Sequence, residues 1–197
     1  MSAKQVEFFL DVGSPATYLA WTQLPALCTA AGATLVLRPM LLGGVFQATG
    51  NQSPVTVPAK GRYTRVDFAR FARRYGVPLN FNPHFPINTL LLMRGAAGLQ
   101  LRQPERLDAY LRCVFQALWV DGVNLNEPAE VARVLAAGGF EPAQLLALAN
   151  DDATKAALRA TTEEAVARGV FGAPTMFVGD EMFFGQDRLD WVSEALR

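Results

Sequence analysis

The chain has 197 residues, of which 51% are hydrophobic and 18% are charged, and its 18 basic residues balance its 18 acidic residues. This composition suits one large domain, or a small domain with a substantial insertion, and excludes a disordered chain. The zero formal net charge argues against a nucleic-acid or anionic-membrane partner, because both attract an excess of Lys and Arg.

The amino terminus and the cysteines indicate the compartment. The first residues, "MSAKQVEFFLD", contain no long apolar segment, and no stretch approaches the roughly 20 apolar residues that a membrane span needs. We therefore expect a cytoplasmic protein. Cys28 and Cys113 belong to no C-x-x-C motif, so we expect buried thiols, no bound metal and no disulfide or dithiol centre.

The first forty residues predict a strand, a helix and a second strand. Residues 5–11 are short and rich in aromatics, and residues 34–40 form a similar apolar run. Residues 15–31 between them have helical spacing, with Gly32 as the expected C-terminal cap and a kink or break expected at Pro25. A strand, a helix and a strand at this spacing favour a βαβ unit with parallel strands.

Helical periodicity then continues from Leu42 to about Gly169. Prolines at positions 104, 128 and 142 mark first turns of helices. Residues 175–185 predict a hairpin, and an amphipathic helix follows. The order βαβ, helical block, ββα is that of an α/β thioredoxin-like fold with a large all-helical insertion. We predict a thioredoxin-like domain at 1–41 and 170–197, and an inserted helical domain at 42–169.

Ser14 and Pro15 stand at the start of the first predicted helix. Serine is a preferred N-cap and proline a preferred first residue, so capping alone explains this pair. The same geometry also favours an anion, because a helix N-terminus presents unpaired N–H groups and partial positive charge. Ser14 is then a candidate to hold a sulfur anion. A Ser-His-Asp hydrolase is disfavoured, since His84 has no evident relay partner and no G-x-S-x-G motif exists.

Two further motifs lie near the carboxyl terminus. In "GVFGAPTMFV", Pro174 makes an ordinary turn before a strand, or it leaves the backbone of Ala173 unpaired and able to bond an extended peptide. The sequence leaves the isomer of this X–Pro bond open. In "FFGQDRLDWV", Asp187 caps the last helix, or Asp187 and Gln186 together hold an amino-acid zwitterion.

The three motifs together fit one ligand. An anion-stabilising serine, a backbone that pairs with a peptide and an amino-acid clamp suit a cysteine-containing peptide with a free γ-glutamyl end, which is glutathione. A free thiol titrates near pH 8.5, and lowering that pKa by one or two units costs roughly 1.4–2.7 kcal/mol. A helix N-terminus with one hydrogen bond can supply this.

At this point the sequence resembles a known family. The segments "FFLDVGSPATYLA", "LLGGVFQATGN" and "GVFGAPTMFVGDEMFFGQDRL" are similar to those of 2-hydroxychromene-2-carboxylate isomerases, which belong with kappa-class glutathione transferases in the DsbA-like branch of the thioredoxin superfamily. The resemblance covers almost the whole chain. It implies a homodimer in which Ser14 contacts the glutathione sulfur, Ala173 pairs with the cysteinyl backbone, and Gln186 and Asp187 hold the γ-glutamyl group.

The resemblance also implies roles for residues in the middle of the chain. Asn51 and Lys60 match positions near the glycyl end of glutathione, although a turn residue and a solvated cation are the simpler readings. Phe46 stands in the segment where the isomerases place polar residues that meet an aromatic acid, and Phe85 stands where a tyrosine is expected. The resemblance therefore implies a more apolar substrate pocket around Phe46 and Phe85.

These observations lead to three hypotheses. The first is a glutathione-dependent isomerase, in which glutathione is a cofactor and the small-molecule substrate is aromatic or conjugated. The second is a kappa-like transferase that consumes glutathione. The third is a thioredoxin-like binding protein without turnover.

Overall fold

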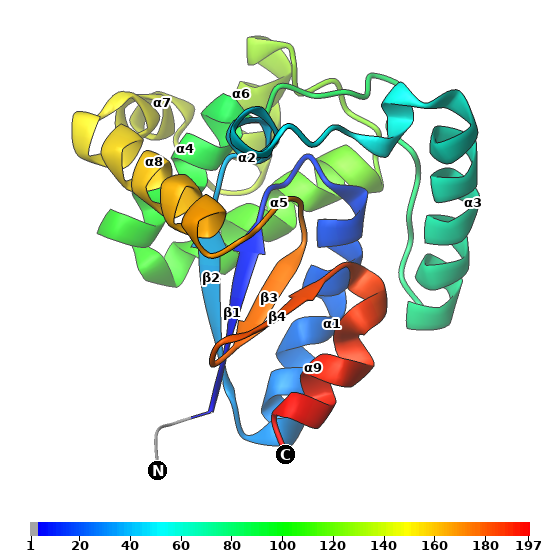
Figure 1. Ribbon diagram of the computed structural model, residues 1–197. Helices are drawn as coiled ribbons and strands as arrows, with labels where there is room; N and C mark the ends of the chain where they lie inside the picture. The colour runs from blue at the N-terminus through cyan, green and yellow to red at the C-terminus, as the bar shows by residue number, and fades with distance from the viewer. Residues whose placement is uncertain (1–3) are drawn as a thin grey trace.

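The computed structural model describes residues 4–197 and contains a four-stranded sheet with strand order β2-β1-β3-β4 (Figure 1). The first half of the chain contributes β1 (Gln5–Leu10), α1 (Pro15–Ala31) and β2 (Thr34–Pro39), and the last part contributes β3 (Thr175–Val178), β4 (Glu181–Phe184) and α9 (Leu189–Ala195). Between them lie α2 (Leu42–Thr49), α3 (Pro58–Tyr75), α4 (Leu90–Arg102), α5 (Leu107–Trp119), α6 (Pro128–Ala137), α7 (Pro142–Asn150) and α8 (Asp152–Ala167).

The strand pairing confirms the predicted fold class. β1 runs parallel to β2 and antiparallel to β3, and β3 pairs antiparallel with β4 as the expected hairpin. Side chains of β1 alternate between two faces: Val6, Phe8 and Leu10 enter the main core with α1 and α5, and Phe9 enters a smaller core with residues of α8. The sheet is thus covered by helices on both faces, which is the arrangement of a thioredoxin-like domain.

All regular elements between β2 and β3 in the described chain are helices, as predicted. Pro104 begins a short 3₁₀ turn, and Pro128 and Pro142 begin α6 and α7. Figure 1 shows α3 set to one side of the molecule. It is joined to the rest by residues 50–57, which include a 3₁₀ turn at Pro54–Thr56, and by residues 76–89. The domain boundaries after residues 41 and 169 stay a prediction, since the main core is continuous across them.

Two details of the helices differ from the sequence-based expectations. α1 runs from Pro15 to Ala31 without a break at Pro25, and it ends at Gly32 in the left-handed conformation (φ 62°) as expected. The last helix begins only at Leu189, after a 3₁₀ turn over Gln186–Arg188, and it has no side-chain cap. The interpretation of Asp187 as the cap of this helix is therefore wrong.

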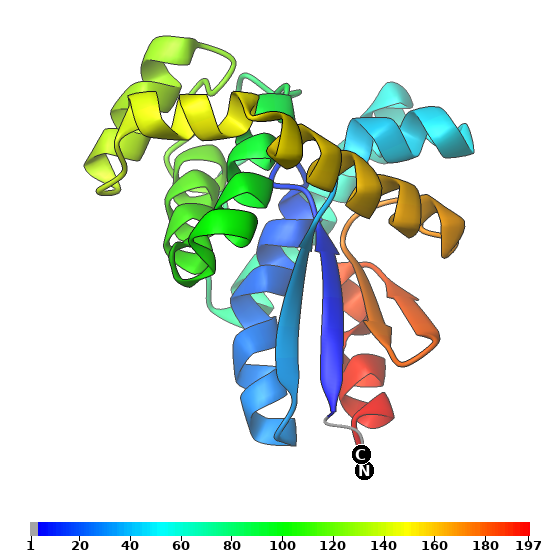
Figure 2. The ribbon, with the colours of Figure 1, turned by 90° about the vertical axis from the view of Figure 1, so that its left-hand side faces the viewer.

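An ion-pair network fastens α8 across the sheet, where Figure 2 shows this helix crossing β1 and β2. Glu7 on β1 pairs with Arg38 on β2 and with Arg168 (3.0 Å), and Glu164 on α8 pairs with both arginines. The Arg168 guanidinium also lies 3.8 Å from the centroid of the Phe177 ring. No helix in the described part of the chain is long and apolar enough to cross a membrane.

Candidate active site

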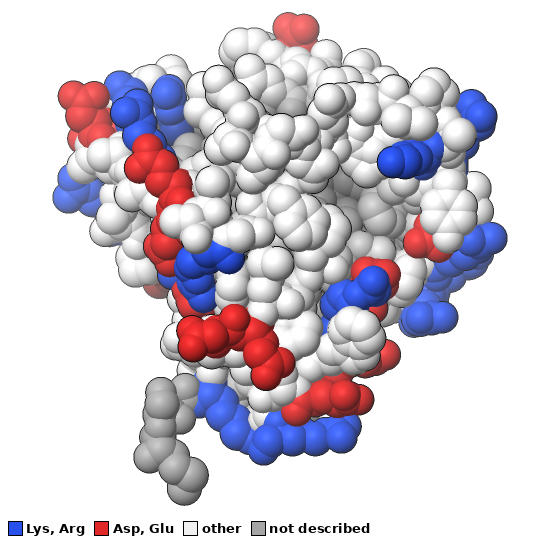
Figure 3. All heavy atoms as spheres, viewed as in Figure 1, with Lys and Arg blue, Asp and Glu red and all other residues white. Residues whose placement is uncertain are grey.

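A cavity of about 1100 Å³ opens between the N-terminal end of α1, the segment from α2 to α3 and the loop before β3. Figure 3 shows this hollow beside α3, bordered largely by uncharged atoms. All the residues that the sequence analysis proposes for the site line it, namely Ser14, Phe46, Asn51, Lys60, Phe85, Ala173, Gln186 and Asp187. The fold thus brings together residues that are separated by up to 173 positions in the chain.

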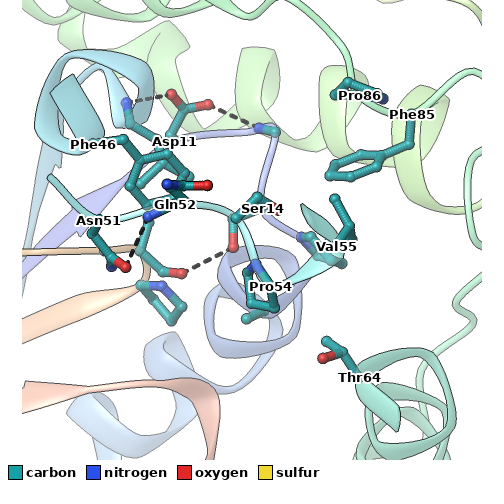
Figure 4. A pocket seen from close by; sticks show the side chains of 18 of the residues that line it. Asp11, Ser14, Phe46, Asn51, Gln52, Pro54, Val55, Thr64, Phe85 and Pro86 are labelled. Carbon is teal, nitrogen blue, oxygen red and sulfur yellow. Dashed lines mark hydrogen bonds between the residues drawn. The ribbon is translucent and has the colours of Figure 1, made fainter. Parts of the chain in front are cut away.

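Ser14 caps α1 and faces the cavity at the same time. Its Oγ accepts a hydrogen bond from the Thr17 N–H (3.2 Å), and its hydroxyl donates to the carbonyl oxygen of Ala173 (3.0 Å), as Figure 4 shows. Its backbone is extended (φ −97°, ψ 119°), the conformation typical of an N-cap, and Pro15 follows as the first helical residue. The capping role is confirmed, and the hydroxyl still lies at the wall of the cavity.

The backbone of Ala173 is not fully unpaired. The Ala173–Pro174 peptide bond is cis, and the ladder between β1 and β3 ends at the pair Phe9–Thr175, so Ala173 lies beyond it. Its carbonyl nevertheless accepts the bond from Ser14. The expectation of a free backbone at Ala173 is therefore wrong for the carbonyl group in this structure.

Asn51 follows α2, and Lys60 lies in the first turn of α3. The side-chain amide of Asn51 donates to the Phe171 carbonyl (2.7 Å) and its oxygen accepts from the Gln52 N–H (2.8 Å), so Asn51 connects two loops of the cavity. Lys60 is exposed in the first turn of α3, a turn that has no side-chain cap. Positive charge therefore gathers at this end of the cavity, from Lys60 and from the helix terminus.

Gln186 and Asp187 line the cavity directly after the β3–β4 hairpin. Gln186 is 5% exposed, lines the cavity and accepts a hydrogen bond at its carbonyl from the Tyr75 hydroxyl (2.6 Å). The Asp187 carboxylate pairs with the side chain of its neighbour Arg188 (2.5 Å) and remains partly exposed. The Asp187 carboxylate therefore lines the cavity near the last turn of α3, where Tyr75 bonds Gln186, whereas Lys60 lies in the first turn of that helix.

Asp11 is a buried carboxyl group that the sequence analysis missed. It is 1% exposed, and its oxygens accept hydrogen bonds from the Gly13 N–H (2.9 Å), the Leu42 N–H (2.8 Å) and the Thr89 hydroxyl (3.1 Å). Burial raises the pKa of Asp11, against the lowering effect of these three bonds. The available signal is an acidic residue that directly ends an apolar strand, "FFLD".

Asp11 connects the elements around Ser14. Gly13 belongs to the turn that carries Ser14, Leu42 is the first residue of α2, and Thr89 precedes α4. The carboxyl group of Asp11 bonds to all three. Asp11 also lines the cavity. Its three hydrogen bonds hold the turn with Ser14 against the starts of α2 and α4.

The remaining wall is aromatic. The Phe81 and Phe85 rings meet edge to face with centroids 6.0 Å apart, and each ring lies 6.0 Å from the buried Trp119. Figure 4 places Phe85 across the cavity mouth from Ser14, with Val55 between them. Phe81 was not among the predicted site residues. His84 does not line the cavity, and no cluster of three His, Cys, Asp or Glu residues suited to a metal occurs within residues 4–197.

Residues 5–197 match the model of the DSBA-like thioredoxin domain. The chain belongs to this family. It is 30% identical over 195 residues to a 2-hydroxychromene-2-carboxylate isomerase of Sphingobium xenophagum, covering 98% of each chain. It is also 30% identical to glutathione S-transferase kappa 1 of Rattus norvegicus, covering 97% of this chain and 90% of the relative.

A solved structure of a 2-hydroxychromene-2-carboxylate isomerase matches the fold with a TM-score of 0.85 at 31% identity, over 98% of this chain and 94% of the other. The resemblance proposed from the sequence is thereby confirmed, and the family member described here is an enzyme of the isomerase and transferase group.

Proposed function

We propose that this enzyme is a glutathione-dependent isomerase of small conjugated or aromatic molecules. The observation that carries the proposal is the gathering of Ser14, Ala173, Lys60 and Asp187 around one cavity at the N-terminus of α1. The near full-length similarity to isomerases and kappa-class transferases supports it. Glutathione is a zwitterionic peptide with a thiol, and each of its groups finds a partner among these residues.

The charges of the cavity fit a tripeptide that lies across it. The Asp187 carboxylate and the Gln186 amide suit the ammonium and carboxylate of the γ-glutamyl end. Lys60, with the uncapped N–H groups of the first turn of α3, suits the glycyl carboxylate at the other end. The central cysteine then lies beside Ala173 and Ser14, at the positive end of α1.

Ser14 and Ala173 act together in this arrangement. In this structure the Ser14 hydroxyl donates to the Ala173 carbonyl (3.0 Å). A peptide N–H that pairs with this carbonyl competes for the same acceptor and frees the hydroxyl to turn toward the sulfur. The bond from Ser14 and the N–H groups at the start of α1 then favour the charged form of the thiol.

Glutathione held by these residues would supply a thiolate, a nucleophile able to add reversibly to a conjugated double bond and so permit rotation about it. The chain's own residues orient the reactants. Phe81 and Phe85 offer ring faces and edges to a flat substrate, and Ser14 holds the charge on the sulfur.

The kappa-like relatives favour a second candidate, a transferase in which glutathione remains attached to its substrate. Free thiol is conserved during an isomerisation and is consumed one-for-one during a transfer. A protein that only binds glutathione shows affinity without either reaction.

The test combines a spectrum with a thiol count. The enzyme is incubated with 2-hydroxychromene-2-carboxylate and, separately, with cis-benzylideneacetone, each with and without glutathione, while absorbance and free thiol are followed. Glutathione-dependent isomerisation of at least one of the two compounds, with constant free thiol, is the expected result. Stoichiometric thiol loss favours the transferase, and the absence of glutathione binding in calorimetry refutes both.

A further inference from the structure

We propose that the second substrate of this cavity is a neutral aromatic compound, such as an aryl ketone or a conjugated aryl enone, and not an aromatic acid. The inference rests on the proposed function for the place of glutathione. It concerns the part of the cavity between Ser14 and the aromatic wall.

The aromatic wall provides a flat, apolar surface. Phe81 and Phe85 meet edge to face and pack against Trp119, which is fully buried. Other apolar side chains complete this part of the lining, among them Pro54, Val55, Phe68, Ile87 and Leu90. A planar aromatic ring buries its faces well on such a surface.

Acidic residues outnumber basic residues in the cavity lining. Within residues 4–197 the lining contains the carboxyl groups of Asp11, Asp67 and Asp187, and a single cationic side chain, that of Lys60. The glycyl carboxylate of glutathione occupies Lys60 under the proposed function. A carboxylate on the second substrate therefore meets no unused cation in the cavity lining, and a carboxylate removed from water without a partner is costly.

Neighbouring donors do not change this balance. The Arg65 guanidinium lies 4.7 Å from the centroid of the Phe81 ring, but Arg65 is not part of the cavity lining. The Leu42 N–H at the start of α2 donates to Asp11, and the Leu90 N–H at the start of α4 donates to the Asn88 side chain (3.1 Å). Under the proposed function, the N–H groups at the start of α1 face the glutathione sulfur.

Two ligands of nearly equal shape test the inference: 2-acetylnaphthalene, which is neutral, and 2-naphthoate, which is charged at pH 7.5. Equilibrium dialysis with saturating glutathione measures both dissociation constants. We expect the ketone to bind at least tenfold more tightly. Equal affinities, tighter binding of naphthoate, or no measurable binding of the ketone would overturn the inference.

A matched pair of variants adds a gain-of-binding test. Val57 and Val66 are both exposed (44% and 53%), but only Val57 lines the cavity. Val57→Lys should raise the affinity for naphthoate at least fivefold, and Val66→Lys should leave it unchanged. An equal effect of both variants contradicts the assignment. Glutathione binding is measured separately: its absence refutes the proposed function, whereas equal affinities of the two ligands for the protein with glutathione bound refute only the ligand class.

Discussion

Ser14 has two tasks in one position. Its oxygen caps α1 through the Thr17 N–H, and its hydroxyl points across the cavity wall to Ala173. The two tasks are separable by experiment, because capping contributes to stability and the contact with a thiolate contributes to turnover.

Ser14→Ala should lower kcat by about 10- to 100-fold, because a hydrogen bond to a charged group is worth about 1.5–3 kcal/mol. The dissociation constant of glutathione should change far less, since this bond matters most to the charged sulfur. Loss of the cap should also cost about 0.5–2 kcal/mol of stability. Steady-state kinetics, calorimetry and urea denaturation measure the three effects.

Asp151→Ala is the matched control. Asp151 caps α8 through the Thr154 N–H and does not line the cavity. It should lose a similar amount of stability and keep its kcat. If Asp151→Ala loses as much activity as Ser14→Ala, the contact of Ser14 with the sulfur is refuted.

Asp11 should make stability depend on pH in a defined direction. Because burial raises the pKa of Asp11 from its usual 3.8, the native state binds this proton more tightly than the unfolded chain. The corresponding stabilisation is complete below pH 3.8 and is lost as the pH rises through the native pKa. The free energy of unfolding of the wild type minus that of Asp11→Asn should therefore fall as the pH rises.

Urea denaturation of both proteins between pH 3.5 and 7.5 measures this difference. Subtraction removes the titration of the carboxyl groups that the two proteins share. A difference that rises with pH would show that the three hydrogen bonds to the carboxylate outweigh its burial.

At the scale of elements, α8 depends on its arginine–glutamate network. Arg168 is partly buried, bonds Glu7 and Glu164, and stacks on Phe177. Arg168→Ala should lower the free energy of unfolding by about 1–2 kcal/mol. Partly buried ion pairs and cation–π contacts contribute more to stability than exposed ion pairs do, because water screens them less. Denaturation curves of the variant measure the change.

Arg133→Ala is the control for that measurement. Arg133 pairs with Glu130 on the exposed surface of α6, where its side chain is 60% accessible. An ion pair this exposed adds little to stability, because water and salt screen it. Equal losses in the two variants would mean that the network across the sheet adds nothing beyond a surface ion pair.

At the scale of the whole molecule, the cavity is formed by segments that lie far apart in the sequence. The cap of α1, the first turn of α3, the loop before β3 and the turn after β4 each add one wall. The homodimer implied by the family resemblance stays a prediction. Sedimentation velocity should give a species of twice the 21.4 kDa chain mass, and a monomer at micromolar concentration would contradict it.

The sequence by itself determined the order of the elements and the place of Ser14. Apolar runs, helical periodicity and the Ser14–Pro15 cap are local signals, because helix starts and buried strands depend on residues a few positions apart. For the same reason the predictions for Gly32 and for the prolines that begin α6 and α7 are confirmed. Pro25 was the exception, since the helix around it continues.

Only the tertiary structure decided what these residues contact. The Ser14 hydroxyl donates to a carbonyl 159 positions away. The Asp11 carboxyl group accepts from the Leu42 N–H, 31 positions away, and from the Thr89 hydroxyl, 78 positions away. Such contacts depend on which segments the folded sheet brings together. No local pattern encodes them, because hydrogen bonds and burial between distant segments exist only after the chain has folded.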